Sequence, residues 1–226
     1  MSVTTAYQGS TLQNVDTVPL SVFAPLVKVY CPDAPDPLIA DMVRLSVTDL
    51  CERTRCWRHI VTVDLTDNNQ AVVAPEYSAI HLFETASLNG VPLEPTQYSH
   101  IEANNVGAAR YITQVNPNTV AVIPFEAGTL ELTLFLKPRH GEDYSSDTGR
   151  PENAFNIAPR YLYETMAEPI AHGALARILE MPGHGYTNPQ AAQQYWMRFN
   201  AFCDRQFRHS IRGQQRAVKR ARYKDF

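Results

Sequence analysis

The spacing of apolar residues changes along the chain, and the first regular stretch predicts a helix over residues 37–55. Apolar side chains recur there every three or four residues, as on one face of a helix with 3.6 residues per turn. Asp36 and Pro37 suit the start of this helix, because aspartate accepts hydrogen bonds from the first N–H groups and proline has no N–H to leave unpaired. The apolar face comprises Ile39, Val43, Val47, Leu50 and Cys51, widened by Leu38, Met42 and Leu45.

Residues 58–137 place apolar side chains at every second position, which is the spacing of a half-buried strand. Asn89-Gly90 between two such runs is typical of a two-residue hairpin turn, because both residues tolerate positive φ. We therefore predict an inserted antiparallel β domain of sandwich or barrel-like form. Its predicted strands cover residues 59–66, 71–73, 78–88, 91–93, 110–115, 119–123 and 129–136.

The last third of the chain returns to helical spacing, with predicted helices over residues 160–181 and 189–212. Pro169 lies inside the first of these, and we expect it to kink the helix or start a new one, because its ring clashes with the carbonyl four residues earlier. Asn188 is placed to cap the second helix and Pro189 to open it. The apolar face of the second helix consists of Tyr195, Phe199, Phe202 and Cys203, with Trp196 beside them.

These patterns predict an α+β fold, in which a small helical bundle carries the β domain as an insertion between its first and second helices. The N-terminal residues are polar and lack periodicity, which is typical of an extended arm or of a disordered terminus. The predicted regions are an N-terminal arm (1–24), a helical bundle domain (25–57 and 159–212), the β domain (58–137), a long loop (138–158) and a basic C-terminal tail (213–226).

Composition and charge narrow the class of protein. With 226 residues, 44% of them hydrophobic, the chain is long enough to bury a substantial core. No apolar run approaches the roughly 20 residues of a membrane helix, and we expect neither a membrane span nor a signal peptide. We therefore expect a soluble protein made in a cytosol, with its four cysteines as free thiols. The net charge of −3 is unevenly distributed, because residues 205–226 carry +7 and residues 1–204 carry −10.

Candidate catalytic and metal-binding groups are weak. Cys51, Cys56 and His59 have the spacing of half a zinc site, but no second pair matches, so we favour two core cysteines and a histidine at a strand edge. Cys203 could pair with His172 or His209, but no nucleophile motif surrounds these residues, and phosphate-binding glycine loops are absent from the sequence. We predict no catalytic residues, no cofactor, no metal and no enzymatic activity. A solvated surface loop explains the acidic residues Glu142, Asp143, Asp147 and Glu152 better than a calcium loop does.

The basic tail is the strongest candidate for a binding element. Its cations recur every three or four residues, so that they would form a stripe along one helical face. The tail could be a solvated, frayed terminus, could dock on an acidic protein surface, or could lie near nucleic acid. We favour a protein groove with acidic walls, because an electrostatic DNA tail needs no apolar anchors. The anchors interleaved with the charges are Phe207, Ile211, Val218, Tyr223 and Phe226.

Three stretches of the chain resemble the head-to-tail adaptor proteins of tailed bacteriophages, which are also called connector, head-completion or tail accessory proteins. Together they span most of residues 25–212. The third stretch is the most specific, because it contains Gly173-Ala174-Leu175-Ala176-Arg177, Met181-Pro182-Gly183 and Asn188-Pro189. The stretches read PDPLIADMVRLSVTDLCERTRCWRHIVTVDL, SLNGVPLEPTQY and EPIAHGALARILEMPGHGYTNPQAAQQYWMRFNAF.

The resemblance implies a structural virion protein at the head–tail junction, synthesised in the cytoplasm of the bacterial host. It implies a ring, usually of twelve subunits, between the portal protein and the next tail component (nozzle, stopper or tail tube). Genomic DNA would pass through the lumen without sequence-specific contact. The predicted portal-docking residues are Arg205, Arg208, Arg212, Arg216, Lys219, Arg220, Arg222, Tyr223 and Phe226. The predicted subunit-packing residues are Tyr195, Trp196, Phe199 and Phe202, although the helix over 37–55 could cover part of this face within the subunit.

Two functions from different classes are consistent with these observations. The first is the ring-shaped adaptor, which forms part of the DNA-ejection channel. The alternative is a nucleic-acid-binding accessory protein that acts through the basic C-terminal tail. The two differ in salt dependence, because DNA binding through phosphate contacts weakens steeply as salt rises.

Overall fold

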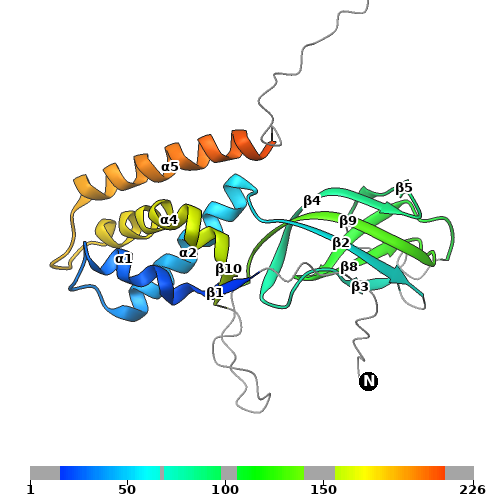
Figure 1. The fold of residues 1–226 in the computed structure, drawn as a ribbon, viewed down its shortest axis with the longest axis horizontal. Coiled ribbons are helices and arrows are strands. Elements are labelled where there is room, and N and C mark those ends of the chain that lie inside the picture. Colours follow the sequence, from blue (N-terminus) through cyan, green and yellow to red (C-terminus); the bar gives the residue numbers. More distant parts are fainter. Residues whose placement is uncertain (1–15, 67–68, 98–105, 140–155, 212–226) are drawn as a thin grey trace, which may run out of the picture.

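The computed structural model describes residues 16–66, 69–97, 106–139 and 156–211, and it has an α+β fold. Figure 1 shows the helices gathered at one end of the molecule and the larger β-sheets at the other. The chain passes from the helical part into the β part and returns to the helical part near its C-terminus. This is the predicted arrangement of a helical bundle with a β insertion.

Three long helices form the helical part: α2 (Asp36–Thr54), α4 (Arg160–Glu180) and α5 (Pro189–Ile211). Each begins within one residue of its prediction, and α2 and α4 end within one residue of theirs. The predicted kink at Pro169 is confirmed, because Met166 has non-helical φ and ψ of −131° and 15°. The kink lies three residues before the proline, where the proline ring crowds the preceding turn.

The helices pack closely because Gly173 of α4 has no side chain. A Cβ atom at this position would lie 2.2 Å from Ser46 Oγ of α2 and 2.9 Å from the Phe199 ring of α5. Ser46 donates a hydrogen bond to the Ile170 carbonyl at 2.7 Å, which also satisfies this buried hydroxyl. A single glycine therefore lets α2, α4 and α5 meet at one point.

The β part consists of two four-stranded sheets packed into a sandwich-like core. Their strand orders are β2-β9-β4-β5 and β3-β8-β7-β6, and the pairing is antiparallel except between β6 and β7. Residues that point between the sheets are buried, and every residue of β8 is buried. The strands are β2 (Arg58–Leu65), β3 (Gln70–Val72), β4 (Ser78–Leu88), β5 (Val91–Pro92), β6 (Glu94–Pro95), β7 (Tyr111–Asn116), β8 (Thr119–Ile123) and β9 (Gly128–Pro138).

The predicted extended arm is wrong over residues 20–24, which are helical, whereas residues 17–19 are extended. Strand β1 (Thr17–Pro19) pairs with β10 (Ile157–Pro159), and a short helix η1 (Leu20–Phe23) leads into α1 (Ala24–Lys28). The side chains of Leu20 and Phe23 are buried in the helical core. Strand β1 has only three residues and pairs with β10 about 140 positions further along the chain, so local spacing carries no signal for it. The rest of the predicted arm, most of the 138–158 loop and the 213–226 tail lie outside the described residues.

Candidate functional site

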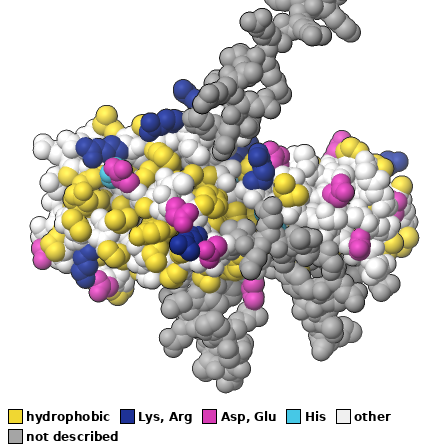
Figure 2. All heavy atoms as spheres, in the orientation of Figure 1, with side chains coloured by type: hydrophobic (Ala, Val, Ile, Leu, Met, Phe, Trp, Pro, Cys, Tyr) yellow, Lys and Arg dark blue, Asp and Glu magenta, His cyan; other side chains and the backbone are white. Residues whose placement is uncertain are grey.

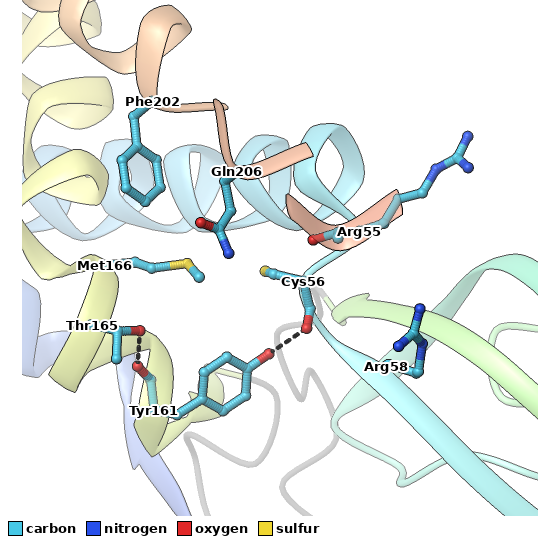
Figure 3. Close-up of a pocket in the computed structure, with 9 residues that line it drawn as sticks. Arg55, Cys56, Arg58, Tyr161, Thr165, Met166, Phe202 and Gln206 are labelled. Atoms are coloured by element: carbon cyan, nitrogen blue, oxygen red, sulfur yellow. Dashed lines mark hydrogen bonds between the residues drawn. The ribbon is translucent and has the colours of Figure 1, made fainter. Parts of the chain in front are cut away.

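A crevice with a volume of about 610 Å³ lies where the helical part meets the β part (Figure 3). It is lined from the end of α2, the first turns of α4 and the second half of α5. A second hollow of about 320 Å³ lies against the outer face of the sheet, with Leu82, Glu84 and Phe135 in its wall. Arg55 and Ser210 line both hollows, so the two adjoin near the last described turn of α5.

The end of α2 places two residues in the crevice. Arg55 is in the left-handed conformation, with φ 52° and ψ 36°, and its N–H bonds the Cys51 carbonyl at 3.0 Å. This turn directs the Cys56 sulfur into the crevice, toward Met166 and Gln206, while the Arg55 side chain extends the other way (Figure 3). The helix terminus therefore separates a thiol on one side from a guanidinium on the other.

The first turn of α4 supplies the opposite wall. The Tyr161 hydroxyl donates to the Cys56 carbonyl at 3.1 Å, and the Thr165 hydroxyl donates to the Tyr161 carbonyl at 2.6 Å. Burial raises the pKa of the Tyr161 hydroxyl, and the neighbouring Cys56 raises it further. Tyr161 is therefore a neutral hydrogen-bond donor that ties α4 to the α2–β2 connection.

The cysteine pair at the crevice is asymmetric. The Cys51 thiol donates a hydrogen bond to the Cys56 sulfur, which raises the pKa of Cys51 and lowers the pKa of Cys56. The third member of the proposed half-site, His59, lies on β2 with a buried side chain whose Nε2 has no hydrogen-bond partner. Within the described ranges, no group of three or more His, Cys, Asp or Glu side chains could hold a metal ion.

The proposed nucleophile residues have different environments. His172 packs against Tyr195, with ring centroids 5.3 Å apart, and lies 3.7 Å from the Glu168 carboxylate. Cys203 is buried, and burial raises its pKa to about 11. Its charged neighbours are Arg53 and Asp49 of α2 together with Asp204. The side chain of His209 lies outside the described residues.

Two arginines line the crevice, Arg55 and Arg58, and two more, Arg205 and Arg208, lie near the C-terminal end of α5; the four differ in their partners. Arg58 is held by Glu84 through two contacts of 2.7 and 2.8 Å, which neutralises it. No ion pair between described residues engages Arg55, Arg205 or Arg208. The Arg55 guanidinium lies 5.3 Å from the Phe207 ring centroid, and the Arg205 guanidinium lies 5.9 Å from that of Phe202. The larger hollow therefore mixes apolar side chains such as Met166 and Phe202 with polar ones such as Thr165 and Gln206. Of the two arginines that line it, Arg58 is paired, and no ion pair between described residues engages Arg55.

Two of the predicted portal-docking residues are described by the structure. Arg205 and Arg208 lie on the exposed side of α5, near its C-terminal end. They reach solvent without a carboxylate partner among the described residues. The other seven positions fall outside the described residues: Arg212, Arg216, Lys219, Arg220, Arg222, Tyr223 and Phe226.

The four predicted subunit-packing residues differ in how much of each side chain is exposed. Phe199 is fully buried between α2 and α4, so it has no surface left for a second subunit, and its assignment to subunit packing needs correction. Trp196 stacks against the Arg177 guanidinium at 4.6 Å and bonds Glu180 at 3.2 Å. Tyr195 and Phe202 are half-buried, and together with Trp196 they keep some exposed surface.

Hydrophobic side chains also gather on the surface of the helical part (Figure 2). Figure 2 shows them over α1, α4 and α5. Val29 and Tyr30, at the end of α1, are 76% and 63% exposed. The Tyr30 ring lies 6.2 Å from the Tyr195 ring of α5, which connects the two helices across this face. We call this surface the apolar helical face; the exposed apolar residues of the elements beneath it are Leu26 of α1, Val29 and Tyr30 just after α1, Tyr163 of α4 and Met197 of α5.

Sequence reasoning identified neither the crevice nor the apolar helical face. Arg55, Tyr161 and Gln206 belong to three elements, and no spacing along the chain connects them. Val29 and Tyr30 lie in a stretch without periodicity, so nothing in the sequence distinguishes them from core residues. The αL residue Arg55 and the non-helical residue Met166 both line the crevice.

Comparison with known proteins adds no assignment: no protein-family model matches the chain, and no curated protein matches it. Among the described residues, no helix is both long and apolar enough to cross a bilayer.

Proposed function

We propose that this protein is a structural component of a bacteriophage virion that forms a ring-shaped adaptor between the portal and the tail. In this role it surrounds part of the DNA-ejection channel and has no enzymatic activity. Its partners are the portal protein, the next tail component and further copies of itself. The resemblance of three sequence stretches to adaptor proteins supports the proposal.

The observation that carries the proposal is the apolar helical face. A monomeric soluble protein rarely exposes a large contiguous apolar surface, and such surfaces are commonly covered by partners. Val29 and Tyr30 are the most exposed members of this face, yet they adjoin a well-packed bundle. A subunit that completes its burial in an assembly explains both features.

The resembling stretches have clear structural roles in this chain. The Gly173–Arg177 motif packs α4 against two helices: Gly173 permits the close approach, and Arg177 bonds Asp49 of α2 at 2.8 Å. The second stretch forms the β4–β5 hairpin, in which Asn89 and Gly90 both have positive φ. The motifs therefore build a scaffold, and the proposed contacts with partners belong to its surface.

The proposed portal contact is tested by removing the tail. A chain truncated after Arg212, which lacks residues 213–226, is expected to keep its circular dichroism spectrum and lose capture by portal rings of the same phage in a pull-down. The tail carries five Lys or Arg and one Asp over residues 213–226, so its loss removes the positive charge proposed to hold the subunit to an acidic surface. Unchanged affinity of the truncated chain for portal rings would contradict the tail's role.

The alternative, a nucleic-acid-binding accessory protein, is favoured by the unpaired Arg205 and Arg208 on α5. It predicts duplex DNA affinity that falls by about 0.9 log units per log unit of salt for each phosphate neutralised. The adaptor proposal predicts weak DNA binding without sequence preference. A fluorescence titration with duplex DNA between low and physiological salt distinguishes the two functions.

A further inference from the structure

We propose that the Cys56 sulfur is a modification site for small disulfides, and that Cys51 then displaces the small thiol to form a Cys51–Cys56 disulfide. This inference goes beyond the proposed adaptor function and does not depend on it. Three features support it: the cap at the end of α2, the crevice in front of the Cys56 sulfur, and the contrast with the other cysteines.

The end of α2 brings the two cysteines together. Arg55 has positive φ, and its N–H bonds the Cys51 carbonyl at 3.0 Å, which is the pattern of a left-handed helix cap. In such a cap the residue after the left-handed one commonly contacts the last helical turn, and here that residue is Cys56. The Cys51 thiol donates a hydrogen bond to the Cys56 sulfur. The two sulfurs are therefore neighbours, as formation of a disulfide requires.

Cys56 is the accessible member of the pair. All four cysteines are free thiols, and Cys31, Cys51 and Cys203 are buried, whereas Cys56 is half-buried. The Cys56 sulfur points into the crevice (Figure 3), whose volume of about 610 Å³ gives room for a small molecule. A small disulfide can therefore reach Cys56 first, and Cys51 lies behind it.

The surroundings of the Cys56 sulfur favour its thiolate, which is the nucleophile in thiol–disulfide exchange. The hydrogen bond from Cys51 lowers the pKa of Cys56 most, and the Thr54 and Tyr161 hydroxyls lower it further against the opposing effect of burial. The same hydrogen bond raises the pKa of Cys51, so this thiol keeps its proton while Cys56 reacts. Burial raises the pKa of Cys203 to about 11, which leaves that thiol protonated.

The reaction exchanges two thiols for one disulfide. The Cys56 thiolate attacks one sulfur of the small disulfide, a mixed disulfide forms at Cys56, and one small thiolate leaves and takes a proton from water. The Cys51 proton then passes to solvent, and the Cys51 sulfur attacks the Cys56 sulfur and releases the second small thiolate. The two cysteines are oxidised by two electrons, and the small disulfide is reduced to two thiols.

The first experiment maps the product in the unmodified sequence. The reduced full chain is treated with hydroxyethyl disulfide at neutral pH, remaining thiols are blocked with iodoacetamide, and tryptic peptides are identified by mass spectrometry. Trypsin cleaves after Arg53 and Arg55, which lie between the two cysteines. We expect a disulfide that joins the peptide of residues 45–53 to that of residues 56–58 and that dithiothreitol reverses. A cross-link between two chains, or one that involves Cys203, would overturn the assigned pair.

Two variants distinguish the attacking thiol from the resolving thiol. Cys51→Ser should accumulate the mixed disulfide at Cys56, because no second thiol displaces the small thiol. Cys56→Ser should leave Cys51 unmodified. Cys203→Ser is the matched control, since it alters another buried cysteine and should change the rate of cross-linking less than about twofold. Modification of Cys51 in the Cys56→Ser variant, or no mixed disulfide in the Cys51→Ser variant, would contradict the proposed order of the two steps. The map of the unmodified sequence still tests the pair if a variant folds poorly.

The pH dependence of alkylation tests the hydrogen bond from Cys51. We expect iodoacetamide to alkylate Cys56 about tenfold faster than Cys203 at neutral pH, with a rate that levels off at lower pH than for a free cysteine. Cys51→Ala removes the donor, so the profile of Cys56 should move to higher pH. Cys31→Ala alters a buried cysteine after α1 and should leave the profile unchanged. Equal rates at Cys56 and Cys203, or an unchanged profile in Cys51→Ala, would show that the cap does not activate Cys56 and would overturn the proposal.

Discussion

Gly173 and Arg177 hold the three long helices together, although neither residue belongs to an apolar stripe. Gly173 removes the side chain where the helices converge, and the Arg177 guanidinium bonds Asp49 at 2.8 Å while stacking on Trp196. Arg177 also donates to the Gly173 carbonyl at 2.8 Å, which links the two positions. A motif that resembles a family signature is here explained by packing.

Replacing Gly173 with alanine should destabilise the protein. The added Cβ would meet the Phe199 ring at 2.9 Å and the Ser46 hydroxyl at 2.2 Å, so one helix must move. We expect a loss of about 1–3 kcal/mol in the free energy of unfolding, measured by urea denaturation. Gly185→Ala is the control, because a Cβ at that position meets no atom within 4 Å. Equal stability of the two variants would show that the helices tolerate a larger separation.

The elbow between α4 and α5 is an element that local chemistry specifies well. Gly183 has φ of 83°, which a residue with a side chain rarely adopts. The Asn188 side chain accepts from the Ala191 N–H at 3.1 Å, and its own N–H donates to the Leu179 carbonyl at 2.9 Å. The predicted cap at Asn188 is therefore confirmed, and the same residue also closes the end of α4.

Removing this cap should loosen the start of α5. Asn188→Ala leaves the Ala191 N–H without its partner, and we expect a loss of about 1 kcal/mol in the free energy of unfolding. Hydrogen exchange should accelerate first at the N-terminal turn of α5. Gln190→Ala, at an exposed position of the same turn, should change stability by less than about 0.5 kcal/mol. Faster exchange at the far end of α5 alone would contradict the assigned cap.

At the scale of the whole molecule, the two parts differ in what they expose. The helical part carries the apolar helical face, and the crevice lies at its border with the β part. Exposed apolar residues of the β part, such as Ile60 on β2, Val91 on β5 and Val106, are scattered over separate strands and a loop. Assembly contacts are therefore expected mainly from the helices and the junction.

A charge on the apolar helical face should impair assembly and spare the fold. Val29 is 76% exposed, so Val29→Glu is expected to change the free energy of unfolding by less than about 0.5 kcal/mol. It should reduce the number of subunits captured per portal ring at least tenfold, because a buried carboxylate at a subunit contact is unpaired. Val91→Glu, at a position 57% exposed on the β4–β5 hairpin, is the control. Equal capture of both variants would show that the apolar helical face is not a contact between subunits of the proposed ring.

The long elements could be predicted from sequence because their patterns are local. Helix α2 and strands β4 and β8 follow from apolar spacing and turn residues within a few positions, and the structure confirms their bounds closely. Strands β1 and β10 could not be predicted, because each has three residues and depends on a partner far along the chain. The burial of Phe199 could not be predicted either, because it depends on α2 before the β insertion and α4 after it.

The sequence by itself determined the α+β class, the order of helices and strands, the elbow at Asn188 and the uneven charge, since each depends on neighbours in the chain. Only the tertiary structure decided that Phe199 is internal, that Leu20 and Phe23 join the core, and that Val29 and Tyr30 face solvent. It also decided that Arg55, Cys56 and Tyr161 share a crevice. Burial and proximity depend on segments that fold together from distant positions, and periodicity carries no information about such pairs.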